Sequence, residues 1–455
     1  MILPPFQEQG ELSEEERELD ELLSQCVRCA SCLPTCPTFL ETLDEGHSPR
    51  GRISLVRALN EGEGGTSKSL NSFLYGCLEC RACETACPNN VIFHRIIEHG
   101  KELLSRADLI PKTGKFFKWF FLKHLFKNGK KLNRFMAFLR FYKKSGLQAL
   151  VRFTRLLRIM PWHLGDLEKL MPEKLGKHIP TKRKRDYTLV PAGDVRATAS
   201  FFTGCIADHW LQPANLATIR LLLRAGYAVT VPAEQECCGA LHVHLGELEQ
   251  GMELARKNIS TFAHEKTGSG PIIVNAAGCG AALKEYGHLL RRQDSEEDAK
   301  VFSKRITDLS ILLASILDDL PAPPNALHKK VTYDDPCHMI HGQGVSAEPR
   351  RLIRFVPGVE FVELVEASWC CGSAGVYNLT NYEMSMEVLE RKLKHVAATG
   401  ADILLTANPG CLLQLQAGVK KAKLDMEVLH LAEFLDRQYP EDPALSPKSD
   451  PPPWK

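Results

Sequence analysis

The sixteen cysteines are the residues of this sequence best suited to chemistry, and they fall into four groups of four. Two of these groups, followed by Pro37 and Pro88, share the spacing C-x2-C-x2-C-x3-C-P; they are Cys26, Cys29, Cys32 and Cys36, and Cys77, Cys80, Cys83 and Cys87. Thiolates at this spacing wrap [4Fe–4S] cubes. The pattern therefore predicts two [4Fe–4S] clusters in the first hundred residues.

The fourth cysteine of each run is expected to cross over to the other cluster, as it does in two-cluster ferredoxins. The first cluster would then be held by Cys26, Cys29, Cys32 and Cys87, and the second by Cys77, Cys80, Cys83 and Cys36. A pair of structural zinc sites is the alternative, since paired C-x2-C units also bind Zn²⁺. Zinc sites, however, do not need two runs that end in Cys-Pro.

The remaining eight cysteines form two matching groups: Cys205, Cys237, Cys238 and Cys279, and Cys337, Cys370, Cys371 and Cys411. Corresponding members lie 132, 133, 133 and 132 residues apart. Constant offsets of this kind indicate an internal duplication. Each copy is therefore expected to be one structural unit with four cysteines.

Short runs rich in β-branched and aromatic residues alternate with helical patterns in both copies. The predicted strands are 199–203, 227–231, 271–275, 331–334, 359–365 and 402–406, and helices are predicted at 213–225, 247–264 and 382–397. This alternation indicates an α/β unit with a parallel sheet, in which the loops after the strands meet at one edge. The four cysteines of each copy follow strands and can converge on one metal centre, whereas buried apolar cysteines are the alternative.

Composition narrows the class of protein. The chain has 455 residues, 44% of them hydrophobic, and 57 Lys and Arg nearly balance 55 Asp and Glu. A disordered or fibrous chain is excluded, and net charge does not indicate a binder of nucleic acid. We see neither a secretory signal nor an apolar run long enough to span a membrane. We therefore expect a cytoplasmic protein whose cysteines bind metal.

A basic segment separates the two cysteine patterns. Residues 109–165 contain fourteen Lys and Arg and no Asp or Glu. Phe117, Phe120, Phe121 and Leu125 follow helical spacing, which predicts a basic amphipathic helix. Such a segment packs on the rest of the chain as a linker, lies on an anionic membrane surface or docks a partner subunit. Nucleic acid is not expected as a partner.

These motifs resemble the glycolate oxidase (glycolate dehydrogenase) iron-sulfur subunit family over nearly the whole chain. The resemblance rests on the residues 48–53 (SPRGRI), 77–88 (CLECRACETACP), 278–286 (GCGAALKEY) and 370–375 (CCGSAG). It implies a multidomain α+β fold: a mainly helical ferredoxin-like part with two [4Fe–4S] clusters, a basic helical linker, and two α/β cysteine-rich (CCG) domains. We expect these parts at 1–105, 106–194, 195–320 and 325–440, with a proline-rich tail at 441–455.

The duplicated domains depart from the heterodisulfide reductase form of this domain, which ends in Cys-x-x-Cys. Ala282 and Gln414 stand where that form has its last cysteine. Four thiolates per copy remain, so a conventional iron-sulfur cluster, a zinc ion or an empty site are the alternatives for each copy.

The resemblance also implies a division of labour. A separate flavin subunit oxidises glycolate to glyoxylate, and this chain passes the electrons toward a membrane quinone, with peripheral attachment to the cytoplasmic face of the membrane. The chain is then not catalytic alone, and no Gly-x-Gly-x-x-Gly loop follows a strand. The alternatives are an iron-sulfur subunit for another 2-hydroxy acid or glycerol 3-phosphate, a heterodisulfide-reductase-like catalytic subunit, and a structural zinc or nucleic-acid-binding module.

Residues near the cysteines complete the candidate sites. Five histidines could bind metal or donate hydrogen bonds to a cluster, although a structural role is the better expectation for each: His209, His242, His244, His338 and His341. Arg50 and Arg52 either lie beside a cluster and raise its potential or belong to a solvated turn.

Overall fold

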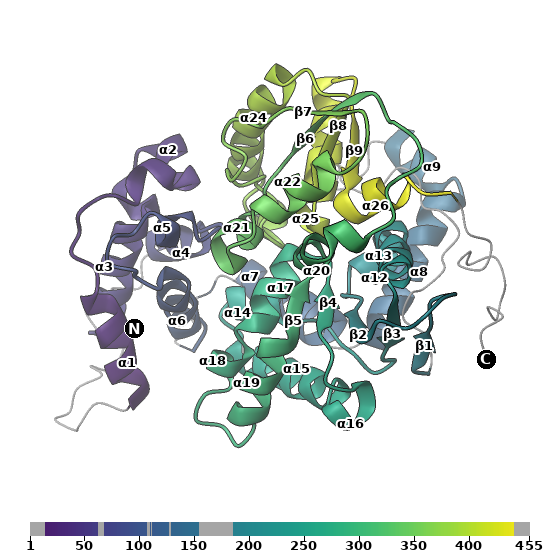
Figure 1. The fold of residues 1–455 in the computed structure, drawn as a ribbon. Coiled ribbons are helices and arrows are strands. Elements are labelled where there is room, and N and C mark those ends of the chain that lie inside the picture. Colours follow the sequence, from purple (N-terminus) through teal and green to yellow (C-terminus); the bar gives the residue numbers. More distant parts are fainter. Residues whose placement is uncertain are drawn as a thin grey trace.

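The computed structural model describes residues 14–61, 68–106, 110, 112–126, 129–153 and 185–440. A helical N-terminal part lies to one side of two α/β units, each built on its own sheet, and the later linker helices, α8 (Gly129–Lys144) and α9 (Leu147–Phe153), lie on the other side of these units (Figure 1). The expected multidomain α+β fold is confirmed. The tail at 441–455 and much of the expected linker lie outside the described residues, and the expected domain boundaries stay predictions.

The N-terminal part is helical because its apolar residues recur at helical spacing around one small core. Its longer helices are α1 (Glu14–Ser24), α3 (Pro49–Asn60), α4 (Lys68–Tyr75) and α6 (Phe93–Arg106). Val56, Leu74, Ile96 and Ile97 are fully buried between them. Two short helices lie at the ends of the cysteine runs: α2 (Pro37–Thr42) begins directly after Cys36, and α5 (Ala82–Thr85) ends two residues before Cys87.

The first cysteine-rich unit is built on a five-stranded sheet in the order β1-β3-β2-β4-β5. The strands are β1 (Tyr187–Leu189), β2 (Ala197–Phe202), β3 (Tyr227–Val231), β4 (Ile272–Val274) and β5 (Ile306–Asp308). All neighbours pair in parallel except β1, which is antiparallel to β3. Since β1 lies within the range expected to be linker, the chain before residue 195 contributes an edge strand to this sheet.

The second unit repeats the same order without the extra edge strand. Its strands β7 (Val359–Phe361), β6 (Lys329–Tyr333), β8 (Ile403–Thr406) and β9 (Glu427–His430) pair in parallel. They correspond in this order to β3, β2, β4 and β5 of the first unit. The internal duplication indicated by the cysteine offsets is therefore also a duplication of topology.

The two units pack against each other through equivalent helices. In the first unit, α13 (Gln212–Arg224) contacts α26 (Leu431–Asp436) of the second, and α20 (Leu309–Ser315) of the first contacts α22 (Ala347–Arg354) of the second. Because α13 corresponds to α22 and α20 to α26, the contact is self-complementary, like a two-fold interface between identical subunits. The units thus share one continuous hydrophobic core.

The linker helices are α7 (Lys112–Phe117), η3 (Lys118–Phe126), α8 (Gly129–Lys144) and α9 (Leu147–Phe153). Leu125, Phe126, Leu132 and Met136 are buried against the first unit. The predicted α-helical face differs from the observed one because η3 is a π-helix, whose wider turn changes which side chains share a face. Phe120 and Phe121 are only half-buried.

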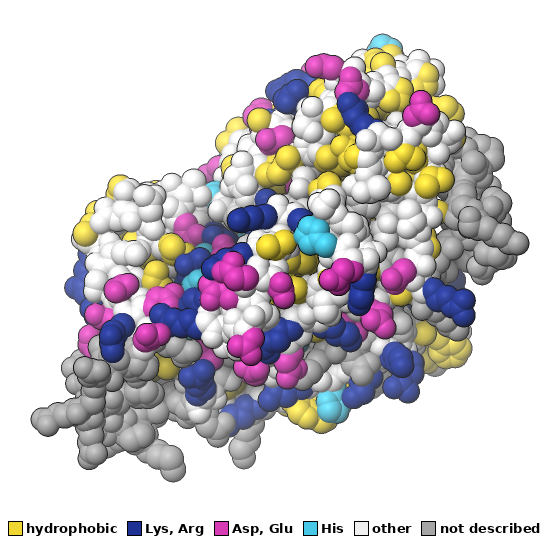
Figure 2. Space-filling model, turned by 60° about the horizontal axis from the view of Figure 1, so that its bottom comes forward, with side chains coloured by type: hydrophobic (Ala, Val, Ile, Leu, Met, Phe, Trp, Pro, Cys, Tyr) yellow, Lys and Arg dark blue, Asp and Glu magenta, His cyan; other side chains and the backbone are white. Residues whose placement is uncertain are grey.

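Among the described residues, no helix combines the length and the apolarity needed to cross a membrane. The face in Figure 2 shows acidic and basic side chains intermingled over most of its described area. This distribution agrees with the near balance of charge over the chain.

Candidate metal centres

The two N-terminal cysteine runs form separate loops with the same backbone conformation. In each run, the second and fourth residues after the first cysteine have left-handed backbone: Arg28 (φ 56°) and Ala30 (φ 70°), and Glu79 (φ 50°) and Arg81 (φ 62°). Non-glycine residues rarely adopt this conformation, and they persist mainly where a functional site requires it. Here it curls each run around a cavity.

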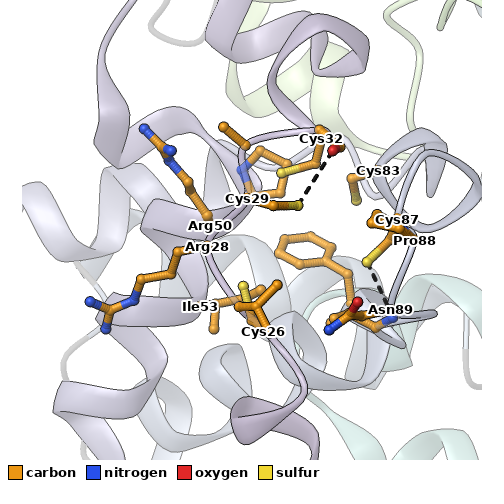
Figure 3. A pocket seen from close by; sticks show the side chains of 16 residues that line it. Cys26, Arg28, Cys29, Cys32, Arg50, Ile53, Cys83, Cys87, Pro88 and Asn89 are labelled. Carbon is orange, nitrogen blue, oxygen red and sulfur yellow. Dashed lines mark hydrogen bonds between the residues drawn. The ribbon is translucent and has the colours of Figure 1, made fainter.

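The first cavity has a volume of about 440 Å³ including its open mouth, and cysteines from both runs line it. Cys26, Cys29 and Cys32 come from the first run, and Cys87 from the second (Figure 3). Cys29 is exposed, so this cavity opens to solvent. The set matches the crossed ligand set expected for the first cluster, with Cys83 as a further neighbour.

The second cavity has a volume of about 370 Å³, and its thiols are less exposed than Cys29, since Cys36 and Cys77 are buried. Cys77, Cys80 and Cys83 line it together with Cys36 of the first run. Its size and its thiol lining suit a cube with four thiolate ligands. The geometry thus brings together the crossed set expected for the second cluster.

Burial disfavours the charged form of several of these thiols. It raises the pKa of Cys32 to about 11 and raises the pKa values of Cys80 and Cys83 well above that of an ordinary thiol. Without metal these side chains stay protonated at neutral pH, so metal binding must release their protons.

The two arginines between the runs have different environments. Arg52 is 1% exposed, donates from Nε to the carbonyl of Phe73 (2.8 Å), and its Nη1 lies 4.0 Å from the sulfur of Cys36. Arg50 lines the first cavity, where it pairs with Glu45 at 2.6 Å and extends away from the cysteines (Figure 3). Arg52 therefore places a buried positive charge beside the second cavity.

The third cysteine group also converges. The sulfurs of Cys205 and Cys237 lie 3.5 Å apart, and those of Cys238 and Cys279 lie 3.3 Å apart. Sulfurs around one tetrahedral ion, each at about 2.3 Å, are roughly 3.8 Å apart. The four thiols of the first unit are therefore close enough to share one metal centre.

The fourth group has the same arrangement in the second unit. Cys370 interacts with Cys337 and Cys371, and Cys371 interacts with Cys411. Gly372 (φ 85°) follows the cysteine pair, and a Cβ there would clash with the carbonyl oxygen of Ser385. Glycine is required at this position so that both adjacent cysteines can face one site.

The positions of the missing fifth cysteines hold other side chains. Gln414 is buried, with its Nε2 donating to Ser385 Oγ (3.0 Å) and its Oε1 accepting from Asn378 Nδ2 (3.1 Å). Ala282 packs against the apolar cluster of the first unit. Neither side chain offers a thiolate, so four thiols per unit are what the structure brings together.

None of the five candidate histidines has a cysteine sulfur among its described hydrogen-bond partners. Instead, each joins a cysteine-rich unit to another part of the chain. His209 Nδ1 lies 3.2 Å from Arg140 Nη2, and His242 Nε2 lies 3.2 Å from the carbonyl oxygen of Leu122, both in the linker. His341 Nδ1 lies 2.8 Å from Thr85 Oγ1 of the N-terminal part.

A buried cluster of charges fills the junction where the N-terminal part meets both units. Glu79, inside the second cysteine run, pairs with Lys101 and with His244, and His244 Nδ1 also lies 3.1 Å from Glu98. His338, beside Cys337, lies 2.8 Å from the carbonyl oxygen of Glu79. The second cysteine run is therefore anchored to the first unit by a side chain and to the second by its backbone.

Sequence reasoning did not find Glu79, Lys101 or the buried ion pair between Lys392 and Asp334 in the second unit. Sequence alone does not predict that Glu79, between two cysteines, or Lys101, in an amphipathic helix, is buried, because both residue types are usually exposed. Asp334, three residues before Cys337 at the end of a predicted strand, was the one such residue that strand patterning could have marked.

Comparison with known proteins identifies each part. The 4Fe-4S dicluster domain matches residues 22–91, the linker region of the glycolate oxidase iron-sulfur subunit matches 113–171, and the cysteine-rich CCG domain matches twice, at 199–284 and 331–416. Fold and sites thus define an iron-sulfur protein with a two-cluster ferredoxin part and a duplicated cysteine-rich domain.

Three relatives match over nearly all of the chain. The "Probable glycolate oxidase iron-sulfur subunit" of Bacillus subtilis is 38% identical over 428 residues, which cover 92% of this chain and 95% of the relative. The "Glycolate oxidase iron-sulfur subunit" of Escherichia coli is 28% identical over 434 residues (93% and 99%). One subunit of the fumarate reductase (CoM/CoB) of Methanothermobacter marburgensis is 28% identical over 428 residues (92% and 73%). The chain belongs to the family of glycolate oxidase iron-sulfur subunits.

Proposed function

We propose that this chain conducts electrons from a flavin subunit, which oxidises glycolate to glyoxylate, toward a membrane quinone. The observation that carries the proposal is the pair of cavities, each lined by three cysteines of one run and the fourth cysteine of the other. Membership of the glycolate oxidase iron-sulfur subunit family supports the choice of substrate.

The ligands follow from the cavity linings. Cys26, Cys29, Cys32 and Cys87 hold one [4Fe–4S] cluster, and Cys77, Cys80, Cys83 and Cys36 hold the other. The third and fourth cysteine groups each hold a metal centre of their own. When bound, the clusters supply one-electron steps between a two-electron flavin and the acceptor.

The protein gives the two clusters different surroundings. The first cavity opens to solvent beside Arg28 and Val27, which is 63% exposed, so a partner subunit can approach it there. The second cavity is lined by less exposed thiols, and Cys80 packs in one apolar cluster with Cys337 and Cys370. Tyr377 of the second unit closes this contact by donating to the carbonyl oxygen of Gly76 (3.1 Å). An exposed thiol at the first cavity and less exposed thiols at the second suit a conduit that accepts electrons at the first cavity.

The linker supports attachment to the membrane. Phe116, Trp119, Phe138 and Phe141 are exposed on it, among lysines and arginines and with no acidic residue between 109 and 165. Basic helices with exposed aromatic residues bind anionic lipid surfaces. Peripheral attachment there would bring the chain to a quinone in the membrane.

Stopped-flow absorbance tests the proposal. Purified anaerobically with its clusters, the chain alone should show no bleaching of its iron-sulfur absorbance when glycolate is added, since the proposal assigns oxidation of glycolate to the flavin subunit. Adding the flavin subunit should restore the bleaching, and Cys80→Ser should reduce transfer to a quinone while flavin reduction continues. Bleaching by glycolate without another protein would show that the chain is itself catalytic.

A further inference from the structure

A buried ion pair joins the three cysteine-bearing loops of the second unit. Lys392, on α24 (Tyr382–Ala398), is fully buried and lies 2.6 Å from Asp334, which is 1% exposed. Burial of a lysine is costly, and a single carboxylate compensates for it only when further hydrogen bonds complete the site. Here such hydrogen bonds are present.

The contacts of the pair lie shortly before ligand cysteines. Asp334 precedes Cys337 by three residues, and its Oδ2 accepts from Thr406 Oγ1 (2.9 Å), at the end of the strand that leads to Cys411. Lys392 Nζ donates to the carbonyl oxygen of Ala367 (2.7 Å), three residues before Cys370. One ion pair therefore holds the approach to all three loops of the second centre.

The first unit has the same fold without this pair. At the shared offset of 132 residues, Phe202 corresponds to Asp334 and Val274 to Thr406. The helix after the cysteine pair has a different offset, which its contact with the glycine after that pair defines. Gly239 of the first unit faces Gly251, and the equivalent Gly372 of the second unit faces Ser385, so the offset in this helix is 134 residues (385 − 251 = 134). Asn258 thus corresponds to Lys392 (392 − 134 = 258).

Uncharged side chains hold the loops of the first unit. Asn258 Nδ2 donates to the carbonyl oxygen of Cys237 (3.0 Å), and Tyr286 donates to that of Cys238 (2.8 Å). Gln235 Oε1 accepts from the backbone N–H of Thr203 (2.8 Å), two residues before Cys205. This unit shows that the fold itself does not need a buried lysine.

We propose that Lys392, held by Asp334, is the positioning residue of the second cysteine-rich centre and keeps its metal bound. The proposal rests on the proposed metal centre at Cys337, Cys370, Cys371 and Cys411. Lys392 sets the relative placement of the cysteine loops. It also supplies a positive charge near the thiolates in the protein interior, where the low dielectric constant strengthens the attraction between opposite charges. The first centre does not depend on Lys392.

Metal retention in the full-length chain tests this proposal and needs neither glycolate nor a partner subunit. Iron and zinc per chain and their release to EDTA and to a ferrous-iron chelator are measured anaerobically for the wild type and for Lys392→Met. Cys371→Ser defines the metal content with the second centre empty. We expect Lys392→Met to release the metal of the second centre at least ten times faster, in a Cys238→Ser background as well, where the first centre is removed.

A double variant separates positioning from simple stabilisation. Asp334→Phe with Lys392→Asn copies two of the corresponding residues of the first unit, and it should regain the thermal stability of the wild type while metal release stays fast. If metal retention returns together with stability, the pair is only structural and the proposal is wrong. It is also wrong if neither variant folds, if Lys392→Met retains its metal, or if the wild type and Cys371→Ser contain equal metal. Failure of glycolate-dependent bleaching would instead contradict the proposed function and leave these measurements unaffected.

Discussion

Cys36 belongs to the first cysteine run by sequence but lies at the second cavity. Replacing it with serine should therefore damage the cluster on Cys77, Cys80 and Cys83, because that cluster loses its fourth thiolate. Electron paramagnetic resonance of the reduced protein would show this loss while the signal of the first cluster persists.

The reciprocal variant is the control for crossed ligation. Cys87→Ser should damage the cluster on Cys26, Cys29 and Cys32 and spare the other. If each serine instead damages the cluster of its own run, the crossed assignment is wrong.

His244 links pH to the junction between the N-terminal part and the first unit. Burial lowers the pKa of His244, but the charge of Glu79 and hydrogen bonds with Glu79 and Glu98 outweigh this effect and raise the pKa to about 10. The folded-state pKa thus lies above the ordinary value near 6.5, so the stabilisation is complete below about pH 6.5 and is lost as the pH rises toward 10.

His244→Gln should consequently lower the melting temperature more at pH 6 than at pH 9. Thermal unfolding followed anaerobically at both pH values checks this difference. His264→Gln, at an exposed position, is the matched control and should change the melting temperature little at either pH. An equal effect of His244→Gln at both pH values would contradict a charged imidazole at the junction.

Among the elements, the linker has a buried face and a basic outer face that can be separated by mutation. Lys118 is unsuitable for the test because it is buried and lies 3.2 Å from Glu247. Lys123, Lys130 and Lys144 are exposed. Each is expected to contribute about 1 kcal/mol to binding an anionic membrane, so changing all three to Gln should lower the partition coefficient roughly a hundredfold.

Sedimentation with phosphatidylserine-containing vesicles at low and high salt measures this effect. The difference from the wild type should shrink at high salt, because salt screens exposed charges. A control with Lys266, Lys304 and Lys421 changed to Gln removes the same charge elsewhere and should bind like the wild type. If both triple variants bind equally, the linker is not the membrane-binding element. Neither variant should lose iron.

Elements with a strong pattern could be predicted from the sequence. The strand at 227–231 and the helices at 213–225 and 382–397 agree with the structure to within a residue or so, since their apolar periodicity is unambiguous. The short strands β1, β5 and β9 were not predicted, and only pairing with a neighbour defines them, whereas the equally short β4 and β7 lie within the longer patterned runs 271–275 and 359–365. In the linker, the π-helix changes the spacing on which the prediction rested.

At the scale of the whole molecule, the placement of the N-terminal part against both units could not be read from the sequence. It depends on contacts between residues far apart in the chain, such as Tyr75 with Leu245, Arg95 with Glu285, and Tyr377 with Gly76. None of these residues has an unusual type or spacing. By contrast, the ligand groups were predictable because metal binding demands a specific residue type at a specific spacing.

The open mouth of the first cavity affects how the clusters withstand dioxygen. Solvent reaches Cys29, whereas Cys36 and Cys77 of the second cavity are buried. Dioxygen should therefore attack the first cluster first, and oxidative damage would isolate the chain from its electron donor while the inner cluster is still intact. A time course of electron paramagnetic resonance during exposure to air should show the signal of the first cluster disappearing before that of the second. Simultaneous loss would mean that burial of Cys36 and Cys77 gives no protection; sequential loss would make the more exposed cluster the component that limits how long the assembly survives aeration.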